Sequence, residues 1–337
     1  MEKKNILVLG SGGFGLSLAV MLNSMGHEVT VWSKFTSELD DIRRDGENKA
    51  KLPGVKISEK IKLTDDISEV KGKDLVIFGI PVNFVRSVAK EAAPYLDSET
   101  VLVNTGKGLE GGSLKFISQV IFEETGKKIV VLTGPSHAEE VAIGMPTTVI
   151  AASEITAQAE YVQNVMSNST LRIYNNDDVI GCEIGGALKN VIALCAGICD
   201  GMGFGDNTKA ALMTRGIWEI SRLGAALGGK TETFAGLSGI GDLIVTCTSM
   251  HSRNRRAGIL IGQGVDPDEA VKQVGTVEGY FCTKAAYELS RKCGICLPIT
   301  EKCYNVLYNG ADPREAIREL MDRPMRDESE LCFYDLK

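Results

Sequence analysis

The chain has 337 residues, of which 44% are hydrophobic and 24% charged, and its 37 basic and 44 acidic residues give a formal net charge of −7 at pH 7. This is the composition of a folded protein long enough for two domains, each able to bury a core without disulfides or a structural metal. The negative charge and the lack of long Lys/Arg runs disfavour nucleic-acid binding but leave room for small basic pockets that bind anions.

The N-terminal segment predicts neither export nor membrane insertion. Only Ile6–Leu9 separate the basic start from Gly10, and no stretch of the sequence approaches the roughly 18 apolar residues of a membrane span. We therefore expect a cytoplasmic protein without an integral membrane segment. Its nine cysteines are expected to be reduced, mostly buried thiols. They are Cys182, Cys195, Cys199, Cys247, Cys282, Cys293, Cys296, Cys303 and Cys332.

Up to about residue 175, short apolar runs alternate with helical patterns, which is typical of parallel strand–helix–strand units. Continuously apolar strands fit a sheet covered on both faces, so this half is predicted to be a doubly wound, Rossmann-type α/β domain. The predicted strands are Ile6–Leu9, Glu28–Trp32, Leu75–Ile80, Val101–Thr105, Ile129–Thr133, Thr147–Ala151 and Leu171–Tyr174. The predicted helices between them are Gly15–Ser24, Phe84–Ala93, Leu114–Glu123 and Ala157–Met166.

From Asp178 onwards the strand pattern stops, and apolar residues recur at helical spacing. We predict a dinucleotide-binding domain over residues 1–177 and a mainly helical substrate or catalytic domain over residues 178–337. No Pro/Ser-rich linker separates them, so we expect a rigid junction. The clearest helical segments are 180–199, 208–227, 284–292 and 313–321.

The first motif is the glycine loop Gly10-Ser11-Gly12-Gly13-Phe14-Gly15, which follows a predicted strand and opens a predicted helix. In a GxGxxG loop the glycines allow a tight turn and close approach of a pyrophosphate, which the helix N-terminus attracts. A merely structural glycine turn is the alternative. In this context we interpret the loop as a dinucleotide site.

The residues after the second strand bear on the choice of dinucleotide. Trp32-Ser33-Lys34 stands where an NAD-binding domain would place an acid, and Ser33 and Lys34 can instead contact the 2′-phosphate of NADP. A solvated Lys34 is the alternative. The sequence favours NADP without excluding NAD.

Three cations stand out from their surroundings. Lys189 lies in an apolar, Gly-rich helical segment, where a partly buried amine can donate and accept protons, unless it extends to the surface. Lys107 follows a predicted strand, at the edge where open α/β sheets bind ligands, although a simple loop charge fits as well. Ser252-Arg253-Asn254 offers donors suited to a phosphate, with a solvated helix end as the alternative.

These motifs, taken together, closely resemble bacterial NAD(P)-dependent glycerol-3-phosphate dehydrogenase, from the first strand to about residue 321. The segments that carry the resemblance are Gly134–Glu140, Gly185–Ala193, Asp200–Gly205, Gly239–Cys247 and Ser252–Arg256. The resemblance implies reversible hydride transfer between sn-glycerol 3-phosphate and dihydroxyacetone phosphate. This reaction would supply glycerol 3-phosphate, the backbone precursor, for phospholipid synthesis. Two departures are Gly13, where the family often has Ser, and Ser136-His137, where many members have Thr-Phe.

The resemblance also implies roles for individual residues. Lys189 would be the proton donor and acceptor, and Lys107 would contact substrate and cofactor and lower the pKa of Lys189 by like-charge repulsion. The implied substrate-binding residues are Lys107, Gly134, Ser136, Lys189, Asp242, Ser252, Arg253 and Asn254. The implied cofactor-binding residues are Gly10, Ser11, Gly12, Gly13, Phe14, Gly15, Lys34, Lys107, Ala138, Arg253, Val277 and Glu278.

Some alternatives stay open at this point. Asp242 can orient Lys189 or a substrate hydroxyl, or only cap the helix Leu243–Cys247. We interpret His137 as local loop structure and the Cys293-Gly294-Ile295-Cys296 pair as packing thiols, and we expect no metal site. A 3-hydroxyacid or sugar-phosphate dehydrogenase and a non-catalytic dinucleotide sensor are the alternative functions. The oligomeric state is not determined by the sequence, which is compatible with a homodimer.

Overall fold

The computed structural model describes residues 2–325, 327 and 328, so Cys332 lies outside the described residues. The chain forms two compact units. The N-terminal unit consists of the residues up to Gly106 together with Lys115–Val179. The C-terminal unit consists of Lys107–Leu114 and the residues from Ile180 onwards. The short segment Lys107–Leu114 thus groups with the second half of the sequence, although it follows a strand of the first.

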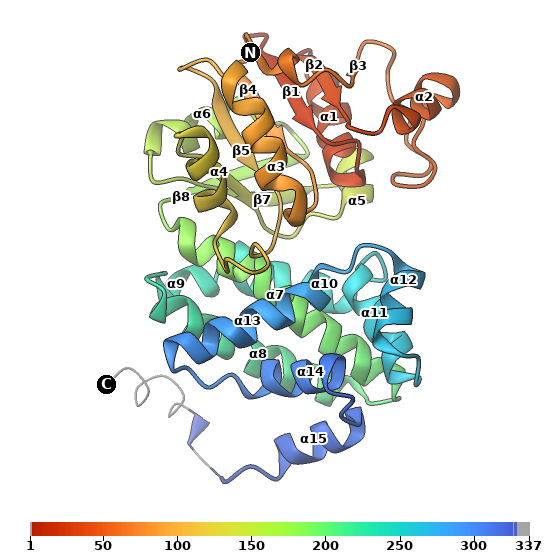
Figure 1. Cartoon of the computed structure of the whole chain (residues 1–337), viewed down its shortest axis with the longest axis vertical. Helices are drawn as coiled ribbons and strands as arrows, with labels where there is room; N and C mark the ends of the chain where they lie inside the picture. The colour runs from red at the N-terminus through yellow and green to blue at the C-terminus, as the bar shows by residue number, and fades with distance from the viewer. Residues whose placement is uncertain (1, 326, 329–337) are drawn as a thin grey trace. The chain divides into compact units, whose positions relative to one another are not determined.

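The N-terminal unit is built on an eight-stranded sheet with the order β3-β2-β1-β4-β5-β6-β7-β8 (Figure 1). Leu7 of the central strand β1 is in register with Thr30 of β2 and with Val76 of β4, both in parallel pairings. The strands are β1 (Asn5–Leu9), β2 (Glu28–Trp32), β3 (Lys62–Thr64), β4 (Leu75–Phe78), β5 (Val101–Asn104), β6 (Val130–Thr133), β7 (Thr147–Ala152) and β8 (Leu171–Asn176). The α-helices are α1 (Gly13–Ser24), α2 (Thr36–Asp45), α3 (Val82–Ala92), α4 (Ile117–Thr125), α5 (Ala138–Ala142) and α6 (Thr156–Met166), with 3₁₀ turns η1 (Ile67–Val70) and η2 (Ala93–Tyr95).

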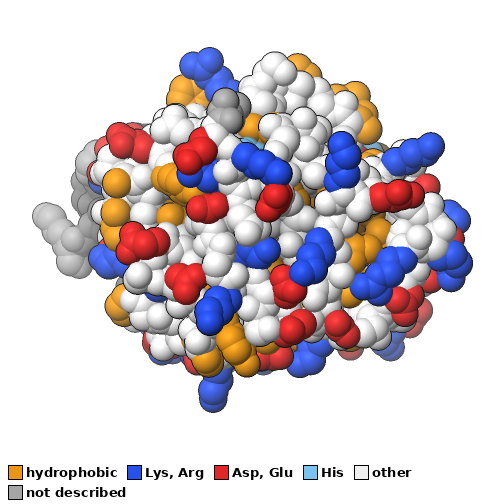
Figure 2. Space-filling view, turned by 90° about the horizontal axis from the view of Figure 1, so that it is seen from above, with side chains coloured by type: hydrophobic (Ala, Val, Ile, Leu, Met, Phe, Trp, Pro, Cys, Tyr) orange, Lys and Arg blue, Asp and Glu red, His pale blue; other side chains and the backbone are white. Residues whose placement is uncertain are grey.

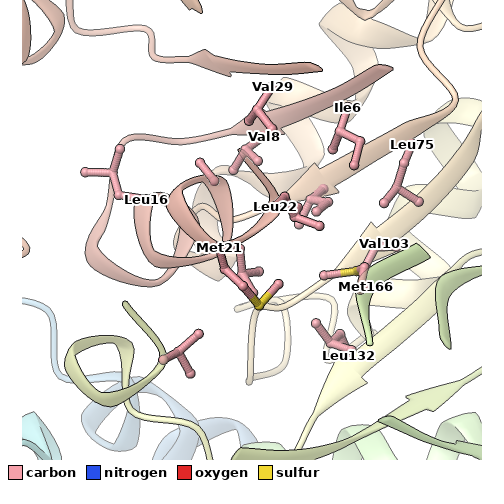
Figure 3. Packing of buried hydrophobic residues seen from close by; sticks show 14 of the residues in the cluster. Ile6, Val8, Leu16, Met21, Leu22, Val29, Leu75, Val103, Leu132 and Met166 are labelled. Carbon is pink, nitrogen blue, oxygen red and sulfur yellow. The ribbon is translucent and has the colours of Figure 1, made fainter. Parts of the chain in front are cut away.

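The core of this unit lies between the sheet and its helices, as Figure 3 shows. Ile6 and Val8 of β1 are fully buried, and Leu22 of α1 packs into the same cluster with Leu75 of β4. A strand buried on both faces needs a continuous apolar run, and this is why β1 and β4 could be predicted from sequence. The doubly wound Rossmann-type fold is confirmed.

Several details of this unit differ from the expectation. β7 runs antiparallel to β6, with Leu132 opposite Ala151, so the sheet is not wholly parallel. The predicted helix from Leu114 is wrong at its start: Leu114 has a φ of 60°, outside the helical region, and α4 begins at Ile117. Neither α2 nor β3 was expected, because α2 buries only Leu39 and Ile42 and β3 is very short.

The described residues of the C-terminal unit are mainly helical, as predicted. Its longest helix, α7 (Val179–Gly201), is long and apolar enough to cross a membrane, but 94% of its most apolar window is buried, as in the core helix of a folded domain. The other α-helices are α8 (Asp206–Ala226), α9 (Thr231–Phe234), α10 (Asp242–Thr248), α11 (Arg253–Gly262), α12 (Pro267–Val274), α13 (Glu278–Cys293), α14 (Pro298–Tyr308) and α15 (Pro313–Met321), and a π-helical turn η3 (Leu237–Gly241) precedes α10.

Two contacts fix the packing of these helices. α7 and α11 touch backbone to backbone, because a Cβ added at Gly197 would lie 2.1 Å from the carbonyl oxygen of Arg255, and one at Gly258 would lie 2.1 Å from that of Leu194. The buried carboxylate of Glu219 on α8 accepts hydrogen bonds from the backbone N–H groups of Ile299 (2.6 Å) and Thr300 (3.1 Å) at the start of α14. Burial raises the pKa of Glu219 to about 7, although these hydrogen bonds oppose the shift.

The surface carries charges of both signs. On the face drawn in Figure 2, Lys and Arg side chains alternate with Asp and Glu side chains over the whole view, and no large region has one sign alone. This face therefore offers no extended basic track to a polyanion.

Candidate active site

The glycine loop of the N-terminal unit has the shape of a phosphate cradle. Gly10 has a φ of +117°, and a Cβ there would lie 2.6 Å from the carbonyl oxygen of Gly79 at the end of β4, so only glycine fits this turn. Gly12 is the N-cap of α1 and supplies no capping side chain, which leaves the first-turn N–H groups of the helix to attract an anion. The loop therefore fits the pyrophosphate of a dinucleotide.

A second loop lies against the glycine loop. A Cβ at Gly13 would lie 2.6 Å from the carbonyl oxygen of Lys51, and Asn48 Nδ2 donates to the carbonyl oxygen of Ser11 over 3.2 Å. The Cβ of Ala138 would be 3.6 Å from the same added atom, so the first residue of α5 adjoins the loop. The close approach of Lys51 gives a physical reason for glycine at position 13.

The residues after β2 do not all face a ligand. Ser33 is buried, and its hydroxyl oxygen accepts a hydrogen bond from the N–H group of Phe35 at 3.2 Å, whereas Lys34 is exposed. The hydroxyl of Ser11 donates to Oε2 of Glu38, the third residue of α2. We did not single out Glu38 from the sequence, because it lies in a mostly charged helix and no local pattern marks it.

The remaining predicted residues of this unit form the turn that follows β6. Gly134 has a φ of +129°, and its carbonyl oxygen accepts a hydrogen bond of 3.0 Å from the hydroxyl of Ser136. The backbone carbonyl of His137 accepts from the N–H group of Val141 at 3.0 Å, so His137 begins the turn into α5. The interpretation of the His137 side chain as local loop structure stays a prediction.

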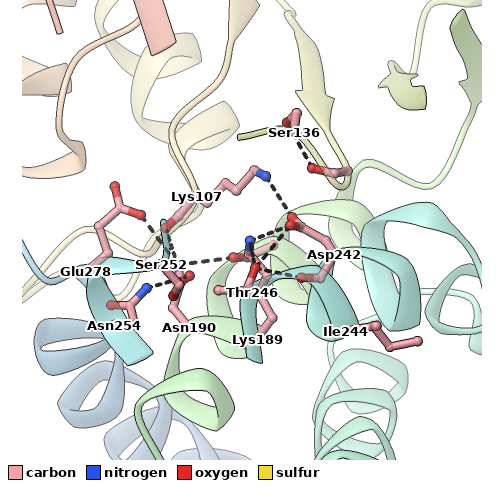
Figure 4. Close-up of polar contacts among 12 residues, drawn as sticks. Lys107, Ser136, Lys189, Asn190, Asp242, Ile244, Thr246, Ser252, Asn254 and Glu278 are labelled. Atoms are coloured by element: carbon pink, nitrogen blue, oxygen red, sulfur yellow. Dashed lines mark hydrogen bonds and ion pairs between the residues drawn. The ribbon is translucent and has the colours of Figure 1, made fainter. Parts of the chain in front are cut away.

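The C-terminal unit brings two lysines onto one carboxylate (Figure 4). Asp242, the first residue of α10, is 1% exposed; its Oδ2 accepts from Lys107 Nζ at 2.7 Å and its Oδ1 accepts from Lys189 Nζ. Lys189 Nζ also donates to Thr246 Oγ1 at 2.7 Å, while the Thr246 hydroxyl donates to the backbone carbonyl of Asp242 at 2.6 Å. Asp242 therefore orients both amines, and it is more than a helix cap.

Burial and neighbouring charges shift the pKa values of these groups. Burial lowers the pKa of Lys189 to about 8; the Asp242 carboxylate opposes this shift and the Lys107 ammonium adds to it. The repulsion expected from Lys107 is thus present but is not the largest cause. Burial alone would raise the pKa of Asp242, but Lys107 and Lys189 outweigh it and hold the pKa below its ordinary value. Lys189 is 5% exposed, so the alternative in which it extends to the surface is wrong.

An amide network joins Lys107 to the start of α13. Asn190 Nδ2 donates to the backbone carbonyl of Lys107 at 3.3 Å and lies 3.4 Å from Oε2 of Glu278. Asn254 Nδ2 donates to Asn190 Oδ1 at 2.9 Å, and Asn254 Oδ1 accepts from the N–H group of Gly279 at 2.8 Å. Burial raises the pKa of Glu278. Asn254 is therefore held by protein groups on both sides of its amide.

The start of α11 carries the predicted phosphate donors. Ser252 is its N-cap, and the Ser252 hydroxyl oxygen accepts a hydrogen bond from the N–H group of Arg255 at 3.2 Å. Arg253, the first residue of this ten-residue helix, is exposed. Arg255 instead pairs with Asp200 at 2.8 Å. An exposed guanidinium at a helix N-terminus is a suitable contact for a phosphate dianion.

The described cysteines are free thiols, five of them buried, with Cys195 and Cys293 partly exposed and Cys296 exposed.

Val277, predicted from the resemblance, is fully buried as the N-cap of α13. We call Lys107, Lys189, Asp242 and Thr246 the lysine centre. Of these four residues, Thr246 was not predicted. Its only signal was its position four residues after Asp242, one helical turn away.

The chain is similar to known glycerol-3-phosphate dehydrogenases. Residues 5–159 match the family described as NAD-dependent glycerol-3-phosphate dehydrogenase N-terminus, and residues 178–318 match the corresponding C-terminus. The curated proteins named glycerol-3-phosphate dehydrogenase (NAD(P)+) include one of Moorella thermoacetica, 53% identical over 97% of this chain and 98% of its own, and one of Desulfitobacterium hafniense, 51% identical over 96% and 93%. A crystal structure of glycerol-3-phosphate dehydrogenase from Coxiella burnetii has a TM-score of 0.91 and 36% identity, and covers 95% of this chain and 99% of that one.

Proposed function

Because the chain belongs to the NAD-dependent glycerol-3-phosphate dehydrogenase family, we propose that it catalyses reversible hydride transfer between sn-glycerol 3-phosphate and dihydroxyacetone phosphate with NAD(H) or NADP(H). The observation that carries this proposal is the buried Lys189, held by Asp242 with a pKa near 8. Reduction of a ketone needs a proton donor at the developing alkoxide, and a lysine of this pKa serves near neutral pH.

Each polar residue of the lysine centre has a part in the mechanism. The dinucleotide, held at the glycine loop, supplies the hydride when bound. Lys189 as the ammonium protonates the carbonyl oxygen, and as the neutral amine it takes the hydroxyl proton in the reverse direction. Asp242 and Thr246 fix the position of Lys189 Nζ. Lys107, on the other carboxylate oxygen of Asp242, adds positive charge near the alkoxide.

Substrate recognition rests on the phosphate, remote from the reacting carbon. Arg253 at the N-terminus of α11 provides a charge-assisted contact to the phosphate, and Ser252 and Asn254 shape that turn. Binding energy at the phosphate then orients the carbonyl towards Lys189. Gly134 and Ser136 complete the substrate-binding residues that we propose. The proposed dinucleotide-binding residues are Gly10–Gly15, Lys34, Lys107, Ala138, Arg253, Val277 and Glu278.

The remaining proposals concern the cellular role. The product glycerol 3-phosphate serves phospholipid synthesis, and the enzyme works in the cytoplasm on a small phosphorylated substrate, without nucleic acid, as a monomer or homodimer. We propose residues 1–177 and 178–337 as its two domains, with the segment Lys107–Leu114 grouping with the second in the structure. The alternative enzymes of the same fold, 3-hydroxyacid and sugar-phosphate dehydrogenases, are not favoured by relatives that are half identical over nearly the whole chain.

The decisive experiment follows absorbance at 340 nm while NADH or NADPH is consumed with dihydroxyacetone phosphate. Unphosphorylated dihydroxyacetone and a 3-oxoacid serve as competing substrates in parallel. We expect turnover with the phosphorylated ketone alone. Equal turnover of the oxoacid would favour a hydroxyacid dehydrogenase, and binding of dinucleotide without any turnover would favour the sensor.

A further inference from the structure

The glycine loop has an acidic neighbour that the sequence pattern does not reveal. Ser11 is 2% exposed, and its hydroxyl donates to the carboxylate of Glu38, which lies in the first turn of α2. On its other side, the carbonyl oxygen of Ser11 is held by Asn48. The carboxylate of Glu38 is thereby fixed against the second residue of the dinucleotide cradle, with all of these residues in the N-terminal unit.

The position of the Glu38 carboxylate beside Ser11 bears on how the adenosine half of a dinucleotide binds. In Rossmann domains the pyrophosphate lies on the first helix, and a carboxylate near the end of the second strand accepts the ribose 2′-hydroxyl of NAD. At the end of β2, Ser33 is engaged by the N–H group of Phe35, and Lys34 is an exposed cation. The expected acid is missing from the strand end, but α2 brings Glu38 to the same loop four residues after Lys34.

We propose that Glu38 is the residue that sets the choice of dinucleotide: it accepts the ribose 2′-hydroxyl of NAD and disfavours the 2′-phosphate of NADP, against the attraction of Lys34. This inference rests on the proposed function and goes beyond it by naming the specificity residue. It also opposes the sequence-based preference for NADP, which rested on the missing acid directly after the second strand.

The chemistry supports both halves of this role. A carboxylate has about four lone-pair sites, so Glu38 keeps acceptor capacity after it takes the hydrogen bond from Ser11. A ribose 2′-phosphate carries a charge of about −1.5 to −2 at neutral pH by analogy with other phosphate monoesters, and it would meet a fixed negative charge. Because Glu38 is partly exposed, salt reduces the repulsion.

The test measures binding of two nucleotide fragments by calorimetry, without turnover. The probes are 5′-AMP and adenosine 2′,5′-bisphosphate, which differ only in the 2′-phosphate. Glu38→Gln removes the charge and keeps an acceptor for Ser11. The matched control is Asp40→Asn, which removes the same charge from the same helix, at an exposed residue that pairs with Arg43 at 2.7 Å.

We expect Glu38→Gln to strengthen binding of the bisphosphate relative to 5′-AMP by about tenfold or more. Asp40→Asn should change this ratio of dissociation constants by less than about twofold. The shift in Glu38→Gln should shrink at high salt. If Glu38→Gln loses its thermal transition, Glu38→Asp replaces it: it keeps the charge but withdraws the carboxylate by one methylene, and we expect weaker binding of 5′-AMP.

The outcomes separate this inference from the proposed function. Equal ratios in Glu38→Gln, Asp40→Asn and the unsubstituted protein, with both probes bound, would overturn the role of Glu38 and leave the dehydrogenase intact. Unchanged 5′-AMP affinity in Glu38→Asp would overturn it in the same way. Failure of the unsubstituted protein to bind either probe, NADH or NADPH would overturn the proposed function and the role of Glu38 together.

Discussion

Asp242→Asn is the substitution that tests the lysine centre most directly. Each carboxylate oxygen of Asp242 accepts one ammonium group, from Lys189 on Oδ1 and from Lys107 on Oδ2. The asparagine side chain keeps the size but removes the charge, so burial and the neighbouring Lys107 act on Lys189 without an opposing carboxylate. The pKa of Lys189 should then fall further below its value of about 8.

The expected rates follow from the protonated fraction of Lys189. At pH 7.5 a pKa of about 8 leaves most of the amine protonated. Each pH unit by which the pKa falls below 7.5 lowers the protonated fraction about tenfold. Ketone reduction needs the ammonium, so kcat/KM for dihydroxyacetone phosphate should fall by about tenfold or more at pH 7.5 and recover at lower pH. Oxidation of glycerol 3-phosphate needs the neutral amine, and the rising limb of its pH profile should move to lower pH by the same amount.

The assay records kcat/KM in both directions from pH 5 to 9. The matched control is Asp200→Asn, because Asp200 also bridges two cations, Lys209 at 2.7 Å and Arg255 at 2.8 Å, outside the lysine centre. The control should keep the pH limbs of the unsubstituted enzyme. A loss in Asp242→Asn that is the same at every pH would show a structural role alone and refute the reasoning.

Four further predictions have separate readouts. Lys189→Ala should lower turnover by about 10²–10⁴ with dinucleotide affinity little changed, and turnover within about threefold of the unsubstituted enzyme would remove its catalytic role. Arg253→Ala should raise KM for dihydroxyacetone phosphate, with a loss of about 2–4 kcal/mol in kcat/KM, but should hardly affect unphosphorylated dihydroxyacetone; equal losses would argue against phosphate recognition. Lys34→Asp should lower the NADPH:NADH ratio of kcat/KM by at least about tenfold, or 1.4 kcal/mol, and more at low salt, whereas an unchanged ratio would leave Lys34 a surface charge. Glu219, with a folded-state pKa of about 7 against 4.5 unfolded, binds its proton more tightly in the folded protein, so the free energy of unfolding relative to Glu219→Gln should fall by about 3 kcal/mol as the pH rises from 4.5 to 7; a difference that is constant with pH, in denaturant titrations, would contradict this.

Local patterns in the sequence were sufficient for most of the fold. The strand β1, the glycine loop and α1 follow one another within 24 residues, so periodicity and turn chemistry identify them together. The direction of β7 is different, because it depends on which strand it pairs with, and its own residues fit either direction. The start of α4 was also missed, because the positive φ of Leu114 has no signature in an otherwise helical run.

The site could be predicted as a set of residues but not as a geometry. Lys107, Lys189 and Asp242 were identified from out-of-pattern charges and from the resemblance, yet the contacts between them span 135 and 53 residues of sequence. No local pattern states that one carboxylate holds both amines. Glu38 was missed for the same reason, since its partner Ser11 lies 27 residues away and tertiary folding alone brings the two together.

The glycine contact between α7 and α11 has a consequence for how this enzyme can diverge. Lys189 lies on α7 and Arg253 starts α11, and at Gly197 and Gly258 no side chain separates the two backbones. A larger residue at Gly197 or Gly258 would therefore push the two helices apart. In the proposed mechanism the reach from phosphate to proton donor, and with it the length of an acceptable substrate, depends on both glycines.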